Sequence, residues 1–582
     1  MGRKRGRPRS VIRTKQVCVM EQQNNMEKRN LILAIVFSAI LLFAVDAIFP
    51  QAESPQTAKA PEVVSSAPVA APAAVKAPAP VSIAQAVDEN AHLTVKTPSV
   101  KGSLRLKGAR FDNLSLLKYR ETLEEDSPHI TLFSPVGTAF PFFAEFGWIS
   151  NEFGLALPNA QTVWSTADEE LTPEKPVTLT WDNQAGLKFI RQISVDENYM
   201  FTVTDRVENY ADRAFTLFNY GLVGRTNVPP SQRGAVLEGL VAYADGGLKE
   251  YAYDKIAKDK QASYDTTGGW AGITDKYWMG VLAFDQNLQN VNIRFSENDS
   301  AEGKHFQADY RLPPMMIQAG QAVQTTARLF AGAKELKLID AYEKDLGIKR
   351  FDLTVDFGWY YFLTKPFFFI LSWLNSMLGN MGLAILMFAF LLRLAMYPIA
   401  NKSYVNMNKM KDIQPKVDAL REKYGDDKVS FNQAVMNLYR DEKINPASGC
   451  LPMLIQIPVF FSLYKVLYIS LELRQAPFYG WIRDLSAPDP SSVFTLFGLV
   501  NWPVPDMINI GIWPVIMGLT MWIQQQMSPK AGDKTQSAVL GLMPWFMMFL
   551  LGHLASGLVI YWSWSNLLSI AQQKAIRRKG KK

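Results

Sequence analysis

An arginine inside an apolar segment is the residue of this sequence with the most unusual chemistry. Arg393 lies within FAFLLRLAMYPIA, well past the middle of a segment long enough to cross a bilayer. An arginine at such a depth costs about 2.5–3.5 kcal/mol on insertion scales. Its side chain therefore either extends along its own stem to the membrane surface or faces a water-filled cavity within a helical bundle. We favour the cavity, because other polar residues recur at a similar depth.

Polar side chains interrupt several of the other apolar segments. They are Gln456 and Ser462 in segment 450–471, Ser563, Ser565 and Asn566 in the last segment, and Gln524, Gln525 and Gln526 near the inner end of segment 508–527. No carboxylate in these segments is placed to neutralise Arg393, whereas transporters and proton relays usually pair such a charge with Asp or Glu. An unpaired arginine is better suited to receive an acidic segment of another chain. Lys465 is a second cation within a span, and we expect its side chain to extend to the nearby outer interface of the same membrane.

The loop 401–449 contains the other candidate contact residues. Its sequence predicts a charged antiparallel hairpin, with one helix over 401–424, a turn at 425–427 and a second helix over 431–443. The apolar seam is thin, so the hairpin is either an ordinary solvated loop or a mobile contact surface. On the second interpretation, Met407, Met410 and Tyr439 would contact a nascent chain, the ribosome or the targeting machinery.

Six segments are apolar over about 20 residues, the length that crosses about 30 Å of hydrocarbon as a helix. They are 31–49, 380–400, 450–471, 508–527, 538–553 and 557–574. We interpret the first as an uncleaved anchor rather than a signal peptide, because Asp46 and Phe49 stand where a cleavage site needs small residues. Segment 356–378 is aromatic and is broken by Lys365 and Pro366, so we expect an amphipathic helix lying in the membrane interface.

The short-loop charges predict the topology. Nine Lys or Arg lie in residues 1–30, nine in the loop 401–449, two in 528–537 and six in 574–582, whereas 472–507 has two against four acids. Because basic loops stay in the cytoplasm, both termini are predicted to be cytoplasmic, including the tails 1–30 and 575–582. The long polar stretch after the first span then lies outside the cytoplasm, which in a bacterium is the periplasm.

Two soluble regions separate the first span from the others. Residues 50–91 are rich in Ala, Pro and Val, with seven prolines between Pro50 and Pro80, and read as an extended linker. Residues 92–350 contain short alternating runs broken by turn residues, such as KFIRQISV and YMFTVTDRVEN. This pattern is typical of an antiparallel β-sandwich. The fold class is therefore a multi-domain membrane protein: an α-helical bundle of six spans plus a large all-β domain.

Composition excludes several other classes. Cys18 and Cys450 are the only cysteines and the four histidines are scattered, so neither a disulfide framework nor a structural metal site is expected. No phosphate-binding loop of the Walker type is present, so ATP is not the expected power source and no cofactor is predicted. The net charge is +7, and the basic residues cluster beside apolar segments. This placement favours a role in membrane topology over DNA binding, with binding of ribosomal RNA as a secondary possibility.

Over nearly its whole length the chain resembles the YidC family of membrane protein insertases. The most specific stretch is INPASGCLPMLIQIPVFFSLY (444–464), and supporting stretches are RLAMYPIANKS (393–403), ELRQAPFYGWIRDLSAPDP (472–490), QQMSPKA (525–531), ASGLVIYWSWSN (555–566) and VDFGWYYFLTKPFF (355–368). The all-β domain resembles the periplasmic domain of Gram-negative members, a β-supersandwich like that of sugar mutarotases.

The resemblance implies a function and a mechanism. Five helices within 380–574 would enclose a hydrophilic groove that is open to the cytoplasm and to lipid but closed toward the periplasm. Arg393 matches the family's groove arginine, and Gln456, Tyr561 and Trp562 match positions on the two helices that meet a client, near Ser462 and Ser563. Clients would be nascent membrane proteins of the inner membrane, inserted alone or with the Sec translocon. No catalytic residue is required.

Two other functions stay open at this stage. A secondary transporter would use Arg393 as an intramembrane anion site, although the five later spans show no inverted repeat. A membrane-anchored sugar enzyme would use His129, His305 and the carboxylates of the β-domain as acid and base. Ordinary surface residues explain those groups better, because the resemblance of a fold says nothing about activity.

Overall fold

The computed structural model describes residues 80–582, apart from 89–90, 230–236, 301, 426, 446–450, 496–498, 501, 503, 506–508, 528–533 and 581–582. The predicted tail 1–30, the anchor 31–49 and most of the linker 50–91 lie outside the described residues. So do residues 446–450 of the most specific family stretch and the last two residues of the predicted basic tail.

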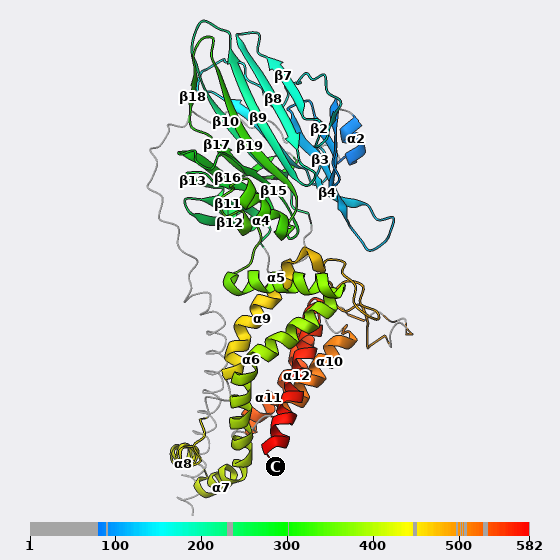
Figure 1. Cartoon of the computed structure of the whole chain (residues 1–582), viewed down its shortest axis with the longest axis vertical. Coiled ribbons are helices and arrows are strands. Elements are labelled where there is room, and N and C mark those ends of the chain that lie inside the picture. Colours follow the sequence, from blue (N-terminus) through cyan, green and yellow to red (C-terminus); the bar gives the residue numbers. More distant parts are fainter. Residues whose placement is uncertain are drawn as a thin grey trace, which may run out of the picture. The chain divides into compact units, whose positions relative to one another are not determined.

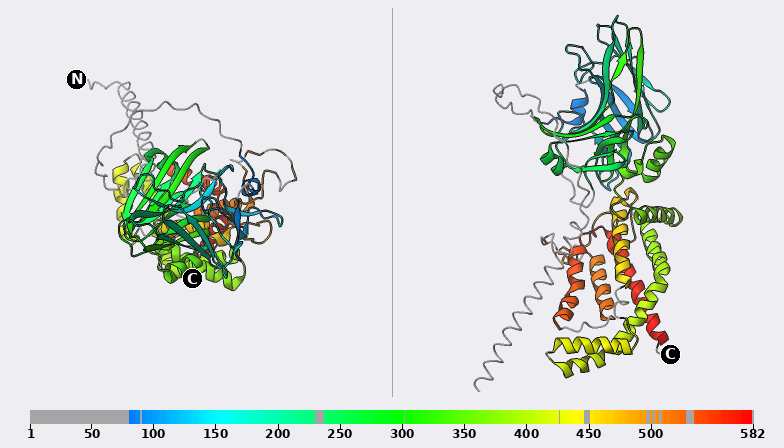
Figure 2. Two further views of the ribbon diagram at one scale, coloured as in Figure 1. Left: turned by 90° about the horizontal axis from the view of Figure 1, so that it is seen from above. Right: turned by 90° about the vertical axis from the view of Figure 1, so that its left-hand side faces the viewer.

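The predicted all-β domain is confirmed as a sandwich of two large sheets (Figures 1 and 2). A short helix, α2 (Ile83–Asp88), precedes it. The first sheet has 11 strands: β1 (His92–Lys96), β2 (Val100–Arg105), β3 (Arg110–Arg120), β4 (His129–Phe133), β5 (Phe142–Ile149), β6 (Glu170–Leu171), β10 (Phe215–Thr226), β13 (Gln261–Thr266), β16 (Val291–Ser300), β17 (Gly303–Arg311) and β18 (Met315–Ile317). Its main path runs β13-β16-β17-β10-β5-β3-β2-β1-β6.

The second sheet has eight strands, in the order β12-β11-β14-β15-β19-β9-β8-β7. They are β7 (Val177–Asp182), β8 (Leu187–Val195), β9 (Met200–Asn209), β11 (Gly239–Ala244), β12 (Gly247–Ala252), β14 (Trp270–Thr274), β15 (Trp278–Ala283) and β19 (Ala322–Ala333). Helix α3 (Tyr253–Asp259) follows β12. All strand pairings of the second sheet are antiparallel. Among the described strands of the first sheet, only the short β1–β6 pairing is parallel.

Strand β8 shows why this sequence forms a sandwich. Its residues alternate between buried and partly exposed, so that every second side chain points into the core, as the pleat requires. One of these inward residues is a charge, Arg191, which is fully buried. It pairs with Asp205 of β9 through two bonds, Nε to Oδ1 at 2.6 Å and Nη2 to Oδ2 at 2.9 Å. The core therefore tolerates a cation because a carboxylate is built in beside it.

Three short elements follow the last strand and lead to the membrane helices. Helix α4 (Leu336–Asp345) and the 3₁₀ turn η1 (Phe351–Thr354) return to the β-domain, where Phe351 packs against Trp270 and Phe330. Helix α5 (Tyr361–Leu378) then corresponds to the predicted interfacial helix and includes Pro366.

The remaining helices form the bundle and its hairpin. They are α6 (Met381–Asp412), α7 (Gln414–Tyr424), α8 (Lys428–Asp441), α9 (Leu451–Ile469), α10 (Ile512–Gln526), α11 (Lys534–Leu551) and α12 (Ser556–Gly580), with a 3₁₀ turn η3 (Leu471–Leu473) after α9. Helix α6 packs against α5, α9 and α12, and α10 packs against α11 and α12. Within the described residues, α6 alone is long and apolar enough to cross a membrane, and Leu454–Ile469 and Val539–Leu551 are shorter apolar helices. The count of six spans stays a prediction.

The boundary between the first core span and the hairpin differs from the prediction. A separate helix over 401–424 was expected, but α6 continues without interruption from Met381 through Pro398 to Asp412. The break comes at Ile413, and Pro415 stands in the first turn of α7. Proline is favoured in the first turn of a helix, whereas inside a helix it has no N–H to donate and its ring clashes with the carbonyl four residues earlier, so α6 ends before Pro415 and α7 begins with it.

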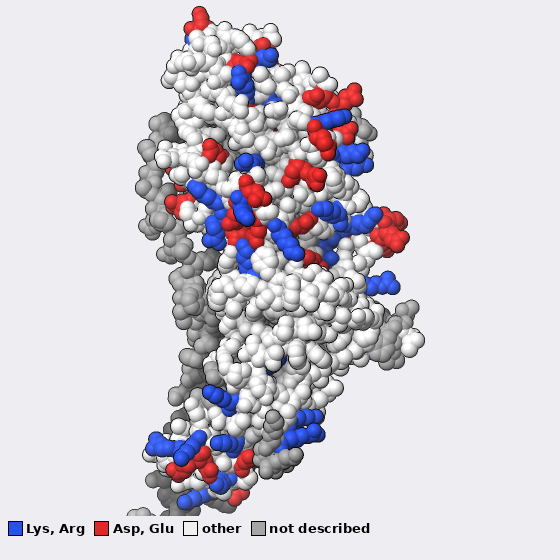
Figure 3. All heavy atoms as spheres, in the orientation of Figure 1, with Lys and Arg blue, Asp and Glu red and all other residues white. Residues whose placement is uncertain are grey.

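The surface of the helical part is largely apolar. Figure 3 shows a broad area with almost no Lys, Arg, Asp or Glu, bordered by charged residues. Large exposed apolar side chains include Leu394 on α6, Phe461 on α9 and Leu542, Phe546 and Leu550 on α11. Such a surface is too large for a water-soluble protein and is typical of contact with lipid.

Candidate functional site

Arg393 joins α6 to α12 through polar groups that carry no charge. Its Nη2 donates to Ser565 Oγ at 2.9 Å and to the Ser565 carbonyl at 3.2 Å. Within the described part of the chain, Arg393 forms no ion pair with a carboxylate. The guanidinium is half-buried. Its positive charge is thus oriented by hydrogen bonds but is not neutralised.

Gln456 and Tyr561 extend this polar contact to a third helix. Gln456 of α9 donates from Nε2 to the hydroxyl of Tyr561 on α12 at 3.1 Å. Tyr561 is one turn before Ser565, so both lie on the same face of α12. The structure therefore brings together Arg393, Gln456 and Tyr561 from α6, α9 and α12, with Ser565 as the link.

Trp562 lies beside this group and packs against an aromatic ring of α9. Its ring centroid is 4.7 Å from that of Phe460 on α9, at an interplanar angle of 59°. The contact fixes α9 against α12 next to the Gln456–Tyr561 bond. The two helices that were predicted to meet a client are therefore held together by one polar contact and one aromatic contact.

Ser462 and Ser563 do not join the Arg393 group. The hydroxyl of Ser563 donates to the Val559 carbonyl one turn earlier on its own helix, at 2.8 Å. Ser462 is fully buried, and its Oγ has no hydrogen-bond partner among the residues described. Their role at a client site stays a prediction.

The predicted hairpin contacts are divided between two helices. Met407 and Met410 lie on the inner end of α6 and Tyr439 on α8, and all three are half-buried. The methionine of this region with the greater exposure is Met436 on α8, at 55%. Its position on the outer face depends on how α8 packs against α7, which the sequence pattern left open.

A polar contact that the sequence analysis did not predict joins α10 to α12. Asn566 Nδ2 donates to Thr520 Oγ1 at 3.2 Å, and both side chains are buried. Asn566 was recognised as a polar residue of the last span, but Thr520 was not singled out. The only sequence signal for Thr520 is a hydroxyl in an otherwise apolar segment.

A cavity of about 490 Å³ lies between the C-terminal ends of α6 and α12, which are the predicted cytoplasmic ends. Its lining includes Tyr397, Asn401, Asn408, Lys411, Asp412 and Arg577. Tyr397 is one turn after Arg393, so the two residues share a face of α6. The cavity therefore begins one turn from Arg393, and its lining combines polar and charged side chains with Val405, Ala575 and Ile576. No cluster of His, Cys, Asp and Glu that could hold a metal ion occurs among the described residues.

The loop after α9 binds the outer ends of the other helices. Ser556, the first residue of α12, donates from its backbone N and its Oγ to the Ala487 carbonyl, both at 2.7 Å. Asp489 accepts from the backbone N of Trp513 in the first turn of α10 at 2.9 Å. A side chain at Gly382, in the first turn of α6, would collide with Phe478. The outer end of the bundle is thus tied together by this loop.

Lys465 has a partner that the sequence analysis did not identify. Instead of only extending to the surface, its Nζ lies 2.6 Å from Asp356 Oδ2, in the segment before α5. Lys465 is therefore a paired cation, in contrast to Arg393.

Two family models match the chain, "YidC periplasmic domain" over residues 92–370 and "60Kd inner membrane protein" over 373–582. A membrane protein insertase YidC of Methylobacterium radiotolerans is 48% identical over 510 residues, covering 86% of this chain and 82% of the relative. The one of Beijerinckia indica is 49% identical (86% and 84% covered), and that of Rickettsia bellii is 44% identical (85% and 89%).

Solved structures give weaker similarities. A crystal structure of an active YidC insertase with its first transmembrane domain resolved is 20% identical, covers 82% of this chain and 91% of its own, and has a TM-score of 0.34. A galactose mutarotase related enzyme from Lactobacillus acidophilus is 10% identical and covers 41% of this chain and 97% of its own, with a TM-score of 0.31.

Proposed function

The chain belongs to the YidC family of membrane protein insertases, and from this premise we propose that it inserts its clients through a hydrophilic groove centred on Arg393. Family membership makes it an inner membrane protein that acts on other membrane proteins in lipid, and an insertase rather than an enzyme. The groove, its direction and the partners beyond clients and lipid are the content of the proposal.

The proposal of a groove rests on the hydrogen-bond partners of Arg393. Its charge is held by the hydroxyl and the carbonyl of Ser565 and by no carboxylate of the described chain. Hydrogen bonds of this kind orient a guanidinium but leave it able to bind an anion, since all five of its N–H groups are donors. An acidic or polar segment of a client supplies the missing partner.

The cavity at the inner ends of α6 and α12 supports entry from the cytoplasm. It extends along one face of α6 from Asp412 to Tyr397, and Tyr397 lies one helical turn from Arg393. The loop that ties together the outer ends of α6, α10 and α12 supports closure toward the periplasm. A polar segment in such a groove stays hydrated over part of its path, which shortens the distance that it crosses in hydrocarbon.

The apolar part of the client follows the lipid-facing side of α9 and α12. On α9, Leu454, Ile457 and Phe461 are exposed at helical spacing, while Leu463 and Val466 face the bundle. Transfer of a client helix from this surface to lipid buries its apolar side chains, at about 0.8 kcal/mol for each CH₂ group. The membrane potential adds about 2.3 kcal/mol per charge moved across 100 mV. Insertion on this scheme needs no ATP.

The remaining parts of the proposal concern topology and partners. We propose six spans with both termini in the cytoplasm and the β-domain in the periplasm, because this number of spans would place all the basic loops and tails on one side. The hairpin of α7 and α8, with Met407, Met410 and Tyr439 at its base, is proposed to contact nascent chains, ribosomes or targeting factors. Some clients would pass through the Sec translocon first.

The test is depletion of the protein in its own host, followed by rescue with the wild type or with Arg393→Ala, Arg393→Lys and Arg393→Glu. Growth and protease protection of a short phage-coat-type client are scored together. We expect wild type and Arg393→Lys to restore insertion and Arg393→Glu to fail. Full rescue by every variant would refute the groove assignment. Unchanged client insertion after depletion would instead favour a transporter, which uptake assays in liposomes would detect.

A further inference from the structure

The segment between α4 and α5 contains two carboxylates that bind lysines of two different helices. Asp352 Oδ2 lies 2.9 Å from Lys365 Nζ on α5, and Asp356 Oδ2 lies 2.6 Å from Lys465 Nζ on α9. Lys365 also pairs with Asp340 of α4 at 3.0 Å. We call residues 350–356 the clamp segment.

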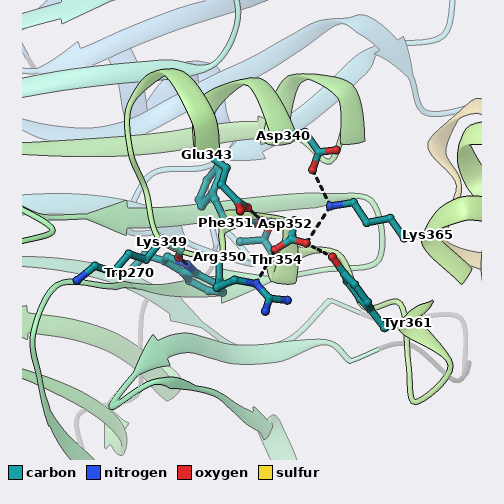
Figure 4. Close-up of polar contacts among 10 residues, drawn as sticks. All are labelled: Trp270, Asp340, Glu343, Lys349, Arg350, Phe351, Asp352, Thr354, Tyr361 and Lys365. Carbon is teal, nitrogen blue, oxygen red and sulfur yellow. Dashed lines mark hydrogen bonds and ion pairs between the residues drawn. The ribbon is translucent and has the colours of Figure 1, made fainter. Parts of the chain in front are cut away.

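Asp352 is fixed firmly to the β-domain side of the clamp segment (Figure 4). It is 2% exposed, its backbone N donates to Glu343 Oε2 at 2.8 Å, and its carboxylate also accepts from Tyr361 and Arg350. Burial alone would raise the pKa of Asp352, but the bonds from Tyr361 and Lys365 lower it below its usual value. Lys365 therefore meets a carboxylate that is charged and immobile.

Asp356 is held just as closely around Lys465. Its Oδ1 accepts from the Gly358 backbone N at 3.1 Å, and its Oδ2 also accepts from the Leu237 backbone N at 3.4 Å. Gly358 has a φ of +68°, which a residue with a side chain adopts only with strain. The Lys465 stem packs 3.5 Å from the position where a Cβ at Gly358 would lie, so the turn is shaped around this lysine.

Further contacts join the same end of α9 to the β-domain. Lys276 Nζ lies 3.8 Å from the ring centroid of Tyr468. Arg474, just after η3, donates to the Arg120 carbonyl at 2.6 Å. Lys465 is therefore the innermost of several contacts along the outer end of α9, and it is one turn beyond the fully buried Ser462.

We propose that the clamp segment holds the outer ends of α5 and α9 against the β-domain and so keeps the client groove closed to the periplasm. Lys465 and Lys365 act as positioning residues, because neither touches a client. Lys465 fixes α9, which contacts the client, and Lys365 fixes α5, which packs against α9. The inference rests on the proposed groove, and it gives the β-domain a mechanical task. Loss of Asp356 removes the carboxylate that lies beside the poorly solvated Lys465, which favours separation of α9 from the segment. Lys365 keeps Asp340 when Asp352 is lost, so the larger effect is expected at Lys465.

The test measures access to the buried side of α9 from the periplasm. Cys18 and Cys450 are replaced by Ser, Ser462→Cys is introduced in the full chain, and spheroplasts are treated with a membrane-impermeant maleimide. We expect slow labelling in this background. Asp356→Asn or Lys465→Met should raise the labelling rate about tenfold, which corresponds to about 1.4 kcal/mol in the opening equilibrium. The exposed pair Arg206–Glu208 supplies the control, since Arg206→Met should leave the rate unchanged.

Charge exchange separates the clamp from general damage. The double variant Asp356→Lys with Lys465→Asp should lower the labelling rate again, although a lysine cannot accept the bonds from the backbone N of Leu237 and Gly358. Protease resistance of the β-domain should stay at the wild-type level throughout. Equal labelling in all variants, or fast labelling that the exchange does not reverse, would overturn the clamp. Failure of the groove itself is distinguishable, because it shows as full client insertion by Arg393→Glu with the labelling pattern unaffected.

Discussion

The β-domain and the helical core treat their buried cations in opposite ways. In the β-domain, Arg191 is fully buried and has Asp205 beside it, and Arg225 forms two bonds of 2.5 and 2.7 Å with Asp275. In the described part of the helical core, Arg393 has the hydroxyl and the carbonyl of Ser565 as partners and no carboxylate. Lys465 of α9 resembles the cations of the β-domain, since it forms an ion pair with Asp356.

The difference separates structural charges from available ones. A cation that is paired with a carboxylate within the chain has its charge neutralised there, and removal of the carboxylate affects stability. A cation held by neutral groups keeps most of its attraction for an anion. The contrast can be tested by removing a partner where one exists and by adding one where none exists.

The largest effect is expected from the removal of Asp205. In Asp205→Ala, Arg191 stays buried without its carboxylate, and we expect the β-domain to lose about 3–5 kcal/mol of unfolding free energy. The measurement is urea-dependent proteolysis of the β-domain in the full chain. The control replaces both charges, with Arg191→Met and Asp205→Leu, and should recover most of the loss. A single variant as stable as wild type would show that the pair is not a structural requirement.

The second effect comes from giving Arg393 a permanent partner. Ser565→Asp places a carboxylate where the hydroxyl now accepts from Arg393, so a client acid has to compete with it. Hydrogen bonds to charged groups contribute about 1.5–3 kcal/mol, and we therefore expect insertion of an acidic client to fall about 10- to 100-fold. Ser565→Asn, which adds the same bulk without charge, should retain most of the activity. Insertion by Ser565→Asp at the wild-type rate would contradict an available charge at Arg393.

A third, smaller effect concerns Lys334, which is 7% exposed and forms no ion pair within the described part of the β-domain. Burial lowers its pKa to about 8, although Asp275 and Asp356 act in the opposite direction. Because the unfolded pKa is near 10.5, the unfolded chain binds more protons between pH 8 and 10.5, and stability rises with pH in that window.

The measurement compares unfolding free energies at pH 7 and pH 9.5. Wild type should gain about 1–2 kcal/mol relative to Lys334→Met, which has no proton to release. Burial also lowers the pKa of Lys276 to about 8, but this lysine is present in both chains and cancels in the difference. An identical pH dependence of the two chains would mean that Lys334 is not a cation held at a cost.

The sequence predicted regular features better than it predicted partners. Strands such as β8 and β9 were predictable because alternation of buried residues is a local pattern. Arg393 and Gln456 were predictable as polar residues in apolar helices. The Arg393–Ser565 bond joins residues 172 positions apart, and it depends on the rotation and contact of two helices. Neither is encoded in a local period, and the same holds for Lys465 with Asp356.

The end of α6 shows a different limit. Basic residues from Lys402 onward suggested that a new helix begins where the membrane ends. The backbone hydrogen bonds of a helix are made within the helix, so α6 can continue into the polar region until Pro415, which has no N–H to donate. Composition predicts a membrane boundary, whereas backbone chemistry decides the helix boundary.

The smallest effect is expected at Ser462, whose buried hydroxyl has no hydrogen-bond partner among the described residues. An unpaired hydroxyl in an apolar setting costs stability, so Ser462→Ala should be as stable as wild type or more stable by up to about 1 kcal/mol. If the hydroxyl is kept for a client, insertion should nevertheless fall about two- to threefold. Ser563→Ala is the matched control, since that hydroxyl already donates to Val559. Should Ser462→Ala and Ser563→Ala insert clients equally well, the groove would end before Ser462, and the contrast between available and satisfied polar groups would be confined to Arg393 and its neighbours.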